Sequence, residues 1–154
     1  MRLRFAKASL SQRAAIDRLM GDAFTPYVEK LGRGSTAGPY PWLEAATGHG
    51  DVYVGLDEAE VVGVVATSRR GDELVIVQLG VDPSRQGAGI GSWLLDQIEQ
   101  TARGDQVKAL SLQTVEIMSD LLRLYHRHGF LVTWKALPTH ARDNHLRVHM
   151  MKRL

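Results

Sequence analysis

The spacing of apolar and polar residues changes near the middle of the chain. Residues 74–81 form a nearly continuous apolar run rich in β-branched side chains, which predicts a central strand covered on both faces. Asp82 and Pro83 end the run, because proline cannot donate a ladder hydrogen bond. From Ile90 onward apolar residues recur at helical spacing, so the pattern predicts a strand, a turn and an amphipathic helix over residues 90–102.

Glycines fill the turn between this strand and this helix, over residues 87–91. The first N–H groups of a helix have no intrahelical acceptor and the macrodipole adds positive charge there, so an anion is favoured. A Walker A loop is excluded, because no Lys-Ser/Thr pair follows the glycines. A dinucleotide fingerprint fits poorly, since Ser92 takes the place of its third glycine and the next strand ends without an acid. A flexible turn that binds no ligand is a further alternative.

The same pattern predicts the other strands of a sheet. Residues 51–56 and 60–67 read as a hairpin, and a turn at 70–72 leads into the central strand, so three strands form an antiparallel meander. A strand at 107–114 follows the helix and completes a parallel strand–helix–strand unit. Further strands are predicted at 3–8, 130–134 and 146–151.

Helices are predicted on either side of these strands. One begins at Ser9 or Ser11 and runs to Met20, with Ala15, Ile16 and Leu19 on its buried face. A second, short helix over residues 23–31 is opened by Pro26 and is followed by a loop over residues 32–41. A last helix over residues 118–127 carries Met118, Leu121, Leu122 and Tyr125 on one face.

Length and composition indicate a single globular domain over residues 1–154. The net charge of +2 comes without a clustered basic patch, so no nucleic-acid partner is expected. No apolar run is long enough to cross a bilayer and the N-terminus reads as a strand, so we expect a cytoplasmic protein with no membrane partner.

The chain has no cysteine, which excludes disulfides and a cysteine nucleophile. Six histidines raise the question of a metal site. His126 and His128 stand two apart on a predicted helix and point differently, and no carboxylate completes a ligand set. We interpret these two residues and His140, His145 and His149 as surface histidines, and we expect no metal.

Two motifs together resemble those of the GCN5-related N-acetyltransferase (GNAT) family. The stretch 86–91 matches its Gln/Arg-x-x-Gly-x-Gly/Ala signature after a Leu-x-Val-x-Pro strand end, and residues 125–130 match its late Tyr-x-x-x-Gly-Phe element. The resemblance implies an α/β (α+β) fold: a mixed, mostly antiparallel twisted sheet with a parallel central strand–helix–strand unit, flanked by helices. In the family those two parallel strands separate at their C-terminal ends, where acetyl-CoA enters.

The resemblance also implies a site for acetyl-CoA as cosubstrate. Main-chain groups of Leu79 and Val81 would pair with the pantetheine arm, and the glycine turn would hold the pyrophosphate. The expected cofactor-binding residues are Leu79, Gly80, Val81, Arg85, Gln86, Gly87, Ala88, Gly89, Ile90, Gly91 and Ser92.

Tyr125 is the expected catalytic proton donor. A phenol with a pKa of about 10 is protonated at neutral pH and can give its proton to a leaving thiolate. The general base stays unassigned, because Val75 stands where some relatives carry glutamate, and Glu73 and Glu116 are weak substitutes. Many relatives have asparagine at the position of Met118, so a cofactor contact is missing or shifted to Ser119.

The resemblance implies transfer of an acetyl group to a primary amine by direct attack in a ternary complex. Tyr27, Arg33, Tyr40 and Trp42 are candidates for the acceptor pocket, and a small-molecule amine is favoured over a protein. The alternative is an acyl-CoA-binding sensor or partner-binding protein on the same fold. A homodimer is a further hypothesis, which rests on the habit of the family and on exposed aromatic residues near Tyr40 and Trp42.

Overall fold

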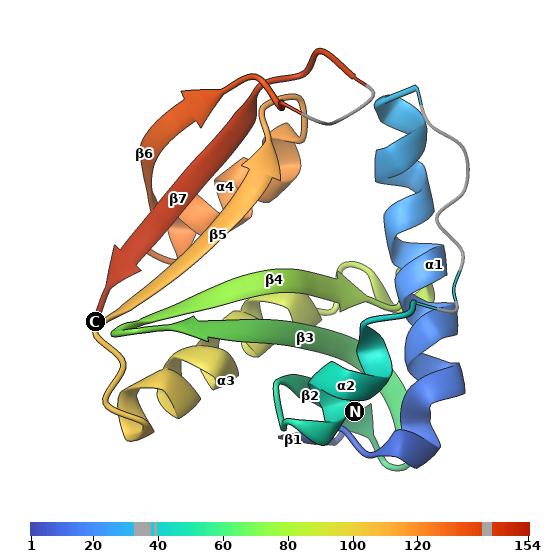
Figure 1. Ribbon diagram of the computed structural model, residues 1–154. Helices are drawn as coiled ribbons and strands as arrows, with labels where there is room; N and C mark the ends of the chain where they lie inside the picture. Colours follow the sequence, from blue (N-terminus) through green and yellow to red (C-terminus); the bar gives the residue numbers. More distant parts are fainter. Residues whose placement is uncertain (33–37, 39, 140–142) are drawn as a thin grey trace.

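One seven-stranded mixed sheet forms the centre of the protein, in a computed structural model that describes residues 1–32, 38, 40–139 and 143–154. The strand order is β1-β2-β3-β4-β5-β7-β6, and β4 and β5 are its parallel pair while all other neighbours are antiparallel (Figure 1). The strands are β1 Leu3–Lys7, β2 Val52–Asp57, β3 Glu60–Arg70, β4 Glu73–Val81, β5 Ala109–Val115, β6 Leu131–Ala136 and β7 Arg147–Arg153. The predicted fold class is therefore confirmed.

The parallel pair separates before its strands end. The ladder joins residues 73–76 to residues 109–112 and stops at Ile76 and Leu112, although β4 continues to Val81 and β5 to Val115. Figure 1 shows β5 rising away from β4, with helix α1 standing across the open end. The sheet is thus opened at the C-terminal ends of its two parallel strands, which is a general location for ligands in α/β sheets.

A β-bulge interrupts β4 just after this branch point. Thr67 of β3 pairs with Ile76 and the preceding Ala66 pairs with Gln78, so Val77 is an extra residue, and its side chain is 52% exposed. An extra residue reverses the alternation of the side chains that follow it. Residues 74 and 76 and, after the bulge, 79 and 81 therefore face the same core, whereas Gln78 and Gly80 face α1. The expectation that this whole strand is covered on both faces is wrong at the bulge.

Helix α1 is a single helix over Arg13–Lys30, not the two helices predicted around Pro26. A short 3-10 turn over Leu10–Gln12 precedes it, capped at Ser9, whose N–H donates to Gln12 Oε1 at 2.9 Å. The proline is tolerated because it lies in the last turns, where it removes one backbone donor, while an apolar face anchors the helix on the sheet. That face consists of Ile16, Leu19, Met20 and Ala23 at helical spacing; Ala15, which was predicted to be buried, is exposed.

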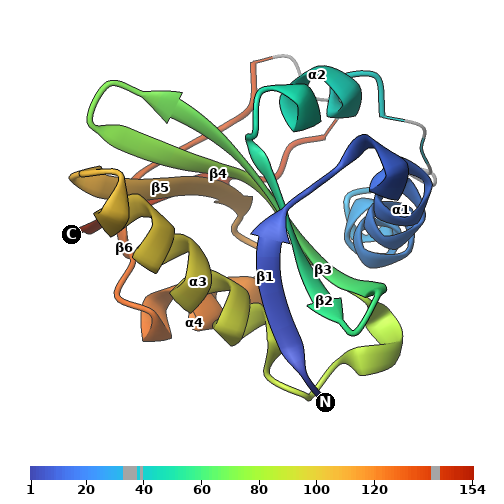
Figure 2. The same cartoon turned by 90° about the horizontal axis from the view of Figure 1, so that it is seen from below.

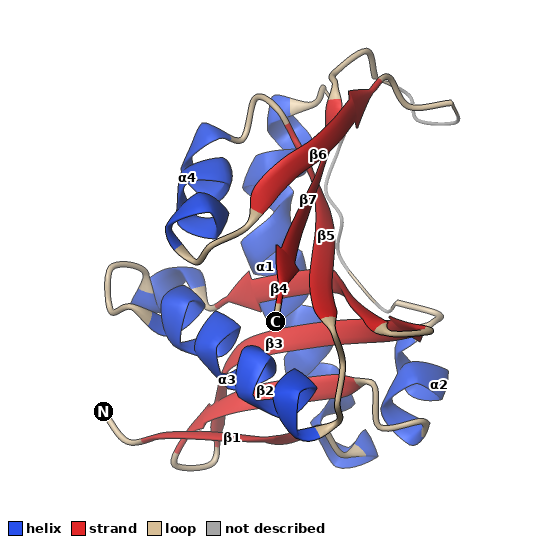
Figure 3. Ribbon diagram, turned by 90° about the vertical axis from the view of Figure 1, so that its left-hand side faces the viewer, coloured by secondary structure: helices blue, strands red, loops and turns tan. Residues whose placement is uncertain are grey.

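Helices cover both faces of the sheet. Helix α2 (Leu43–Gly48), which the sequence pattern did not predict, lies with α1 on one face. Helices α3 (Ile90–Gly104) and α4 (Ser119–Arg127) lie on the other face (Figures 2 and 3). Each face has its own apolar core, one beneath α1 and α2 and one beneath α3 and α4. Within the described residues, no helix has the length and apolar character needed to cross a bilayer.

Candidate active site

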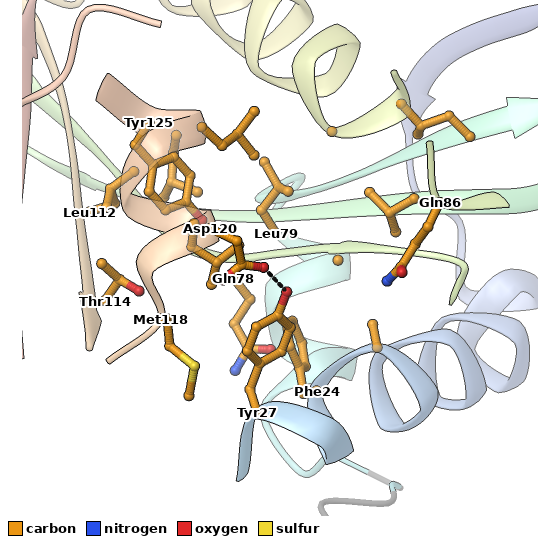
Figure 4. A pocket seen from close by; sticks show the side chains of 18 of the residues that line it. Phe24, Tyr27, Gln78, Leu79, Gln86, Leu112, Thr114, Met118, Asp120 and Tyr125 are labelled. Atoms are coloured by element: carbon orange, nitrogen blue, oxygen red, sulfur yellow. Dashed lines mark hydrogen bonds between the residues drawn. The ribbon is translucent and has the colours of Figure 1, made fainter. Parts of the chain in front are cut away.

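A cavity of about 730 Å³ occupies the opening between β4 and β5. Side chains from α1, β4, the end of β5 and α4 surround it, and the glycine turn before α3 closes one end (Figure 4). Gly80 lets α1 pack close to β4, because a Cβ at this position would lie 3.4 Å from Leu19 Cδ2 and 3.4 Å from Phe24 Cζ. The separated strands and the close helix together produce the cavity.

The glycine turn has a backbone that glycine alone adopts readily. Asp82 Oδ1 accepts hydrogen bonds from the N–H and the hydroxyl of Ser84, both at 2.9 Å, and starts a 3-10 turn over Pro83–Arg85. Gly87 and Gly89 then have φ of +88° and +80°, in the left-handed region. No described atom lies within 4 Å of a Cβ built on either residue. The turn is therefore open on the side of its glycines, and Gly89 caps α3 directly.

This geometry fits the phosphate groups of a nucleotide-type ligand. The first N–H groups of α3 have no intrahelical acceptor, and a 15-residue helix contributes its dipole at the same point. Of the cofactor-binding residues predicted from the sequence, all except Ala88 line the cavity. Ala88 is exposed in the turn itself.

Arg85 lines the cavity, but its guanidinium is held by two carboxylates. Its Nη1 lies 2.6 Å from Asp57 Oδ2 and its Nη2 lies 2.7 Å from Glu60 Oε2, at the turn between β2 and β3. The hydrogen bond from Arg85 lowers the pKa of Asp57, and the same bond raises the pKa of Arg85. The ion pairs thus connect the start of the glycine turn to the neighbouring hairpin.

The free edge of β4 suits an extended ligand. Beyond Ile76 its backbone groups on the side of β5 have no strand partner among the described residues. Backbone N–H and C=O groups bind strongly to complementary partners, and an extended chain can take the place of a missing strand. Leu79 and Val81, predicted from the sequence to bind the pantetheine arm, lie on this stretch and line the cavity.

Tyr125 extends from α4 into the opposite side of the cavity. Its side chain is 7% exposed, and its ring meets Phe130 edge to face at a centroid distance of 6.0 Å. The pKa of Tyr125 is raised to about 12, mostly by burial and also by the nearby Tyr27 and Asp120. The group is therefore a phenol, not a phenolate, over the whole neutral range.

Tyr27 and Asp120 bridge the mouth of the cavity from opposite helices. The Tyr27 hydroxyl donates a hydrogen bond to Asp120 Oδ2 at 3.2 Å, drawn as a dashed line in Figure 4. Burial and this carboxylate raise the pKa of Tyr27 to about 12. Among the described residues predicted for the acceptor pocket, Tyr27 is the one that lines the cavity.

The other predicted acceptor residues lie elsewhere. Tyr40 and Trp42 have ring centroids 6.0 Å apart and pack against the core beneath α1 and α2, and neither belongs to the described lining of the cavity. Both are half-buried, so they do not form the exposed aromatic surface on which the homodimer hypothesis partly rested. The exposed aromatic of the sheet is Trp134 of β6, and Arg33 lies outside the described residues.

Neither glutamate considered as a base lies at the cavity. Glu73 lies at the start of β4, and Glu116 accepts a 2.6 Å hydrogen bond from Lys135 Nζ. Met118 does line the cavity, at the N-cap of α4, whereas Ser119 is exposed and outside the lining. Neither Met118 nor Ser119 therefore supplies the amide that many relatives have at this position.

The polar lining residues Asp120 and Gln78 are among those that were not predicted from the sequence. Asp120, in the first turn of α4, is the only carboxylate among the described lining residues. Gln78 Oε1 is shielded from solvent and has no hydrogen-bond partner in the described part of the chain. No sequence pattern indicated either residue, because Gln78 stands inside an apolar run and an acid in a first helical turn is commonplace.

The histidines do not form a metal site in the described structure. No group of three or more His, Asp or Glu side chains there could hold an ion. His128 Nδ1 lies 3.4 Å from Asp96 Oδ1, which joins the end of α4 to α3. His149 stacks on Trp134 at a centroid distance of 5.0 Å and contacts Thr133 Oγ1.

Comparisons with known proteins agree with this architecture. The profile of the acetyltransferase (GNAT) family matches residues 15–130. No curated protein sequence matches the chain. Among solved structures, the ribosomal-protein-S18-alanine N-acetyltransferase of Escherichia coli superposes with a TM-score of 0.78 at 17% identity, over 99% of this chain and 94% of that one. Ard1 of Thermoplasma volcanium superposes with a TM-score of 0.81 at 18% identity, over 99% of this chain and 97% of that one. The PaiA N-acetyltransferase of Thermoplasma acidophilum, solved with coenzyme A, superposes with a TM-score of 0.73 at 12% identity, over 100% of both chains.

Proposed function

The chain belongs to the acetyltransferase (GNAT) family, and from this premise we propose that it transfers an acetyl group from acetyl-CoA to a primary amine. One observation carries the proposal: the anion-binding turn, the free edge of β4 and the buried phenol of Tyr125 all border the same cavity. A fold with this opening but no ligand would not require these three features to border one cavity.

Acetyl-CoA supplies the activated acetyl thioester. The amides of residues 87–91 and the start of α3 hold its phosphates, and the unpaired edge of β4 at residues 79–81 orients its extended arm. Main-chain donors near the thioester carbonyl can also stabilise the negative charge that develops on its oxygen. Apolar side chains at Leu79 and Val81 are compatible with this role, because the backbone does the binding.

The reaction requires three proton movements. The neutral amine nitrogen attacks the acetyl carbon, so a C–N bond forms and the C–S bond breaks. The nitrogen loses one proton to solvent, the departing thiolate takes one proton from the hydroxyl of Tyr125, and Tyr125 regains one proton from solvent. Tyr125 can take this role because a phenol is protonated at neutral pH and its position on α4 brings it to the cavity.

We favour a small-molecule amine as the acceptor. The α1 wall of the cavity carries the apolar side chains Phe24, Val28 and Leu31, which suit a compact apolar body. A protein N-terminus is the competing acceptor, since one structural neighbour acts on the alanine of ribosomal protein S18. The alternative of a CoA-binding sensor without transfer is favoured by Met118, which replaces an amide found in many relatives.

A CoA-release assay tests the proposal. The protein is incubated with acetyl-CoA and a panel of primary amines and N-terminal peptides, and free thiol is measured while calorimetry reports acetyl-CoA binding. We expect binding together with CoA release that depends on the acceptor. Tight acetyl-CoA binding with no acceptor-dependent release across the panel would favour the sensor instead.

A further inference from the structure

The two ends of the cavity differ in charge. Arg127 lies in the last turn of α4, at the end that His128 joins to Asp96 of α3, whereas Asp120 lies in the first turn, at the end that meets α1. Seven residues of helix place them about 10 Å apart along its axis. The third charged lining residue, Arg85, is paired with Asp57 and Glu60. The α3 end therefore suits phosphates, and the α1 end carries a negative charge.

Asp120 is an exposed residue at the mouth of the cavity, and one hydrogen bond orients its carboxylate. The hydroxyl of Tyr27 donates to its Oδ2 at 3.2 Å and uses one lone-pair site of the carboxylate. An ionised carboxylate offers about four such sites on two oxygens, so further donors can bind. Figure 4 shows Asp120 between the ring of Tyr27 and the hydroxyl of Tyr125, the group that we assign to proton transfer.

Gln78 is a second, independent observation at the same cavity. The bulge at Val77 turns its side chain toward α1, and its Oε1 is shielded from solvent without a described hydrogen-bond partner. A shielded oxygen without a donor costs about 1–3 kcal/mol, so such a group usually has a partner in the functional state. Gln78 lines the cavity, so a rotation of its side chain would bring Oε1 to a donor of a bound ligand.

Asp120 and Gln78 thus offer hydrogen-bond acceptors beside the apolar side chains of Phe24 and Leu31. An ammonium group has donors and no acceptor, and it carries the charge that complements Asp120. An anionic group beside the amine would be repelled by the same carboxylate.

On the basis of the proposed transferase function, we propose that Asp120, with Gln78 Oε1, binds the ammonium group of the acceptor, which gives one proton to solvent before the neutral amine attacks the thioester. The acceptor is then a cationic primary amine on an apolar body, with no carboxylate or phosphate next to the amine. Phenethylamine represents this class. Phenylalanine differs from it by a carboxylate next to the amine, and phenylalaninamide carries a neutral amide at the same place.

The test measures binding of these three amines to the CoA-loaded protein by calorimetry. We expect the wild-type protein to bind phenethylamine at least tenfold more tightly than phenylalanine, with phenylalaninamide in between. Asp120→Asn removes the charge and keeps the shape, so it should weaken phenethylamine binding about tenfold and bring the ratio between phenethylamine and phenylalanine close to one. A merely structural role of Asp120 would not change that ratio.

Two further variants act as controls. Asp22→Asn removes an exposed carboxylate of α1 that is outside the cavity lining, and it should leave all three affinities unchanged. Gln78→Leu should weaken phenethylamine binding several-fold while leaving the free energy of unfolding unchanged or higher, because it removes a shielded oxygen that has no partner. Calorimetric binding of CoA by each variant verifies that the variant is folded.

The outcomes separate this inference from the proposed function. Wild-type affinities in Asp120→Asn, or equal wild-type affinities for phenethylamine and phenylalanine, would overturn the ammonium site even if amines release CoA. Tight binding of an alanine-terminated peptide without binding of phenethylamine would overturn the assignment of an apolar small amine. Binding of phenethylamine that depends on Asp120, with no CoA release from acetyl-CoA, would support the site and contradict the transferase.

Discussion

Ile76 of β4 and Leu112 of β5 form the last pair of the one parallel ladder found in the described sheet. Beyond this pair the strands separate, and the cavity with its glycine turn, its free strand edge and its buried tyrosine lies in the opening. One local property of the sheet therefore brings together residues that lie up to 104 positions apart in the chain, from Ala23 to Arg127.

The first prediction concerns the glycine turn as the phosphate site. Ala88 is preferable to Gly89 for mutation, because Gly89 has φ of +80° and any side chain there would strain the backbone. Ala88→Glu adds a negative charge to the exposed turn, and Coulomb repulsion should weaken acetyl-CoA binding roughly tenfold at moderate salt. Ala88→Gln has the same size without the charge and should bind within about twofold of the wild type. Equal affinities of the two variants, measured by calorimetry, would place the phosphates elsewhere.

The second prediction distinguishes two roles of Arg85. If its ion pairs position the turn, Arg85→Ala and Asp57→Ala should both weaken acetyl-CoA binding by a similar factor, because each removes the 2.6 Å contact. A direct contact of Arg85 with phosphate would make Arg85→Ala much the more harmful of the two. We expect the two variants to lose affinity by a similar factor, since Nη1 and Nη2 of Arg85 are both already bound to carboxylates. Acetyl-CoA affinities of the two variants decide between these roles.

The third prediction is a loss of stability at alkaline pH. The pKa of Tyr125 is raised from 10.0 to about 12 in the folded protein. The stability that its neutral, buried phenol contributes is therefore complete below pH 10 and is lost as the pH rises toward 12. For a residue that is 7% exposed, the full difference corresponds to roughly 3 kcal/mol of the free energy of unfolding. Tyr125→Phe cannot titrate, and its free energy of unfolding should fall less steeply above pH 10.

Urea unfolding of the wild type and of Tyr125→Phe at pH 9, 10 and 11 measures this difference. The wild type should lose more stability than the variant at each step. Parallel curves for the two proteins would mean that Tyr125 titrates with the same pKa in the folded and unfolded states.

Sequence periodicity predicted most of the strands, because each alternates or runs apolar over several residues. The central strand–helix–strand unit and the family motifs at residues 86–91 and 125–130 were sufficient for the fold class, which the structure confirms. The unbroken α1 was not predictable, because the packing of its apolar face on the sheet outweighs the local effect of Pro26.

The acceptor end of the cavity depended on tertiary structure. The bulge at Val77 is a pairing feature, so nothing in the period of residues 74–81 shows that Gln78 faces α1. Asp120 becomes notable through its hydrogen bond to Tyr27, 93 residues away in the chain. The resemblance predicted Tyr40 and Trp42 at the acceptor pocket, but packing places them against the other core.

The most direct test of transfer in this cavity is the single-turnover rate of Tyr125→Phe, measured as acetylated amine by mass spectrometry with the best acceptor of the panel. The substitution keeps the ring that meets Phe130 and removes only the acidic proton, so affinity for acetyl-CoA should change little. Our account predicts that the rate of acetyl transfer falls roughly ten- to a thousand-fold, the usual contribution of a positioned general acid. A single-turnover rate equal to that of the wild type would contradict it and would leave Tyr125 as a core residue of α4.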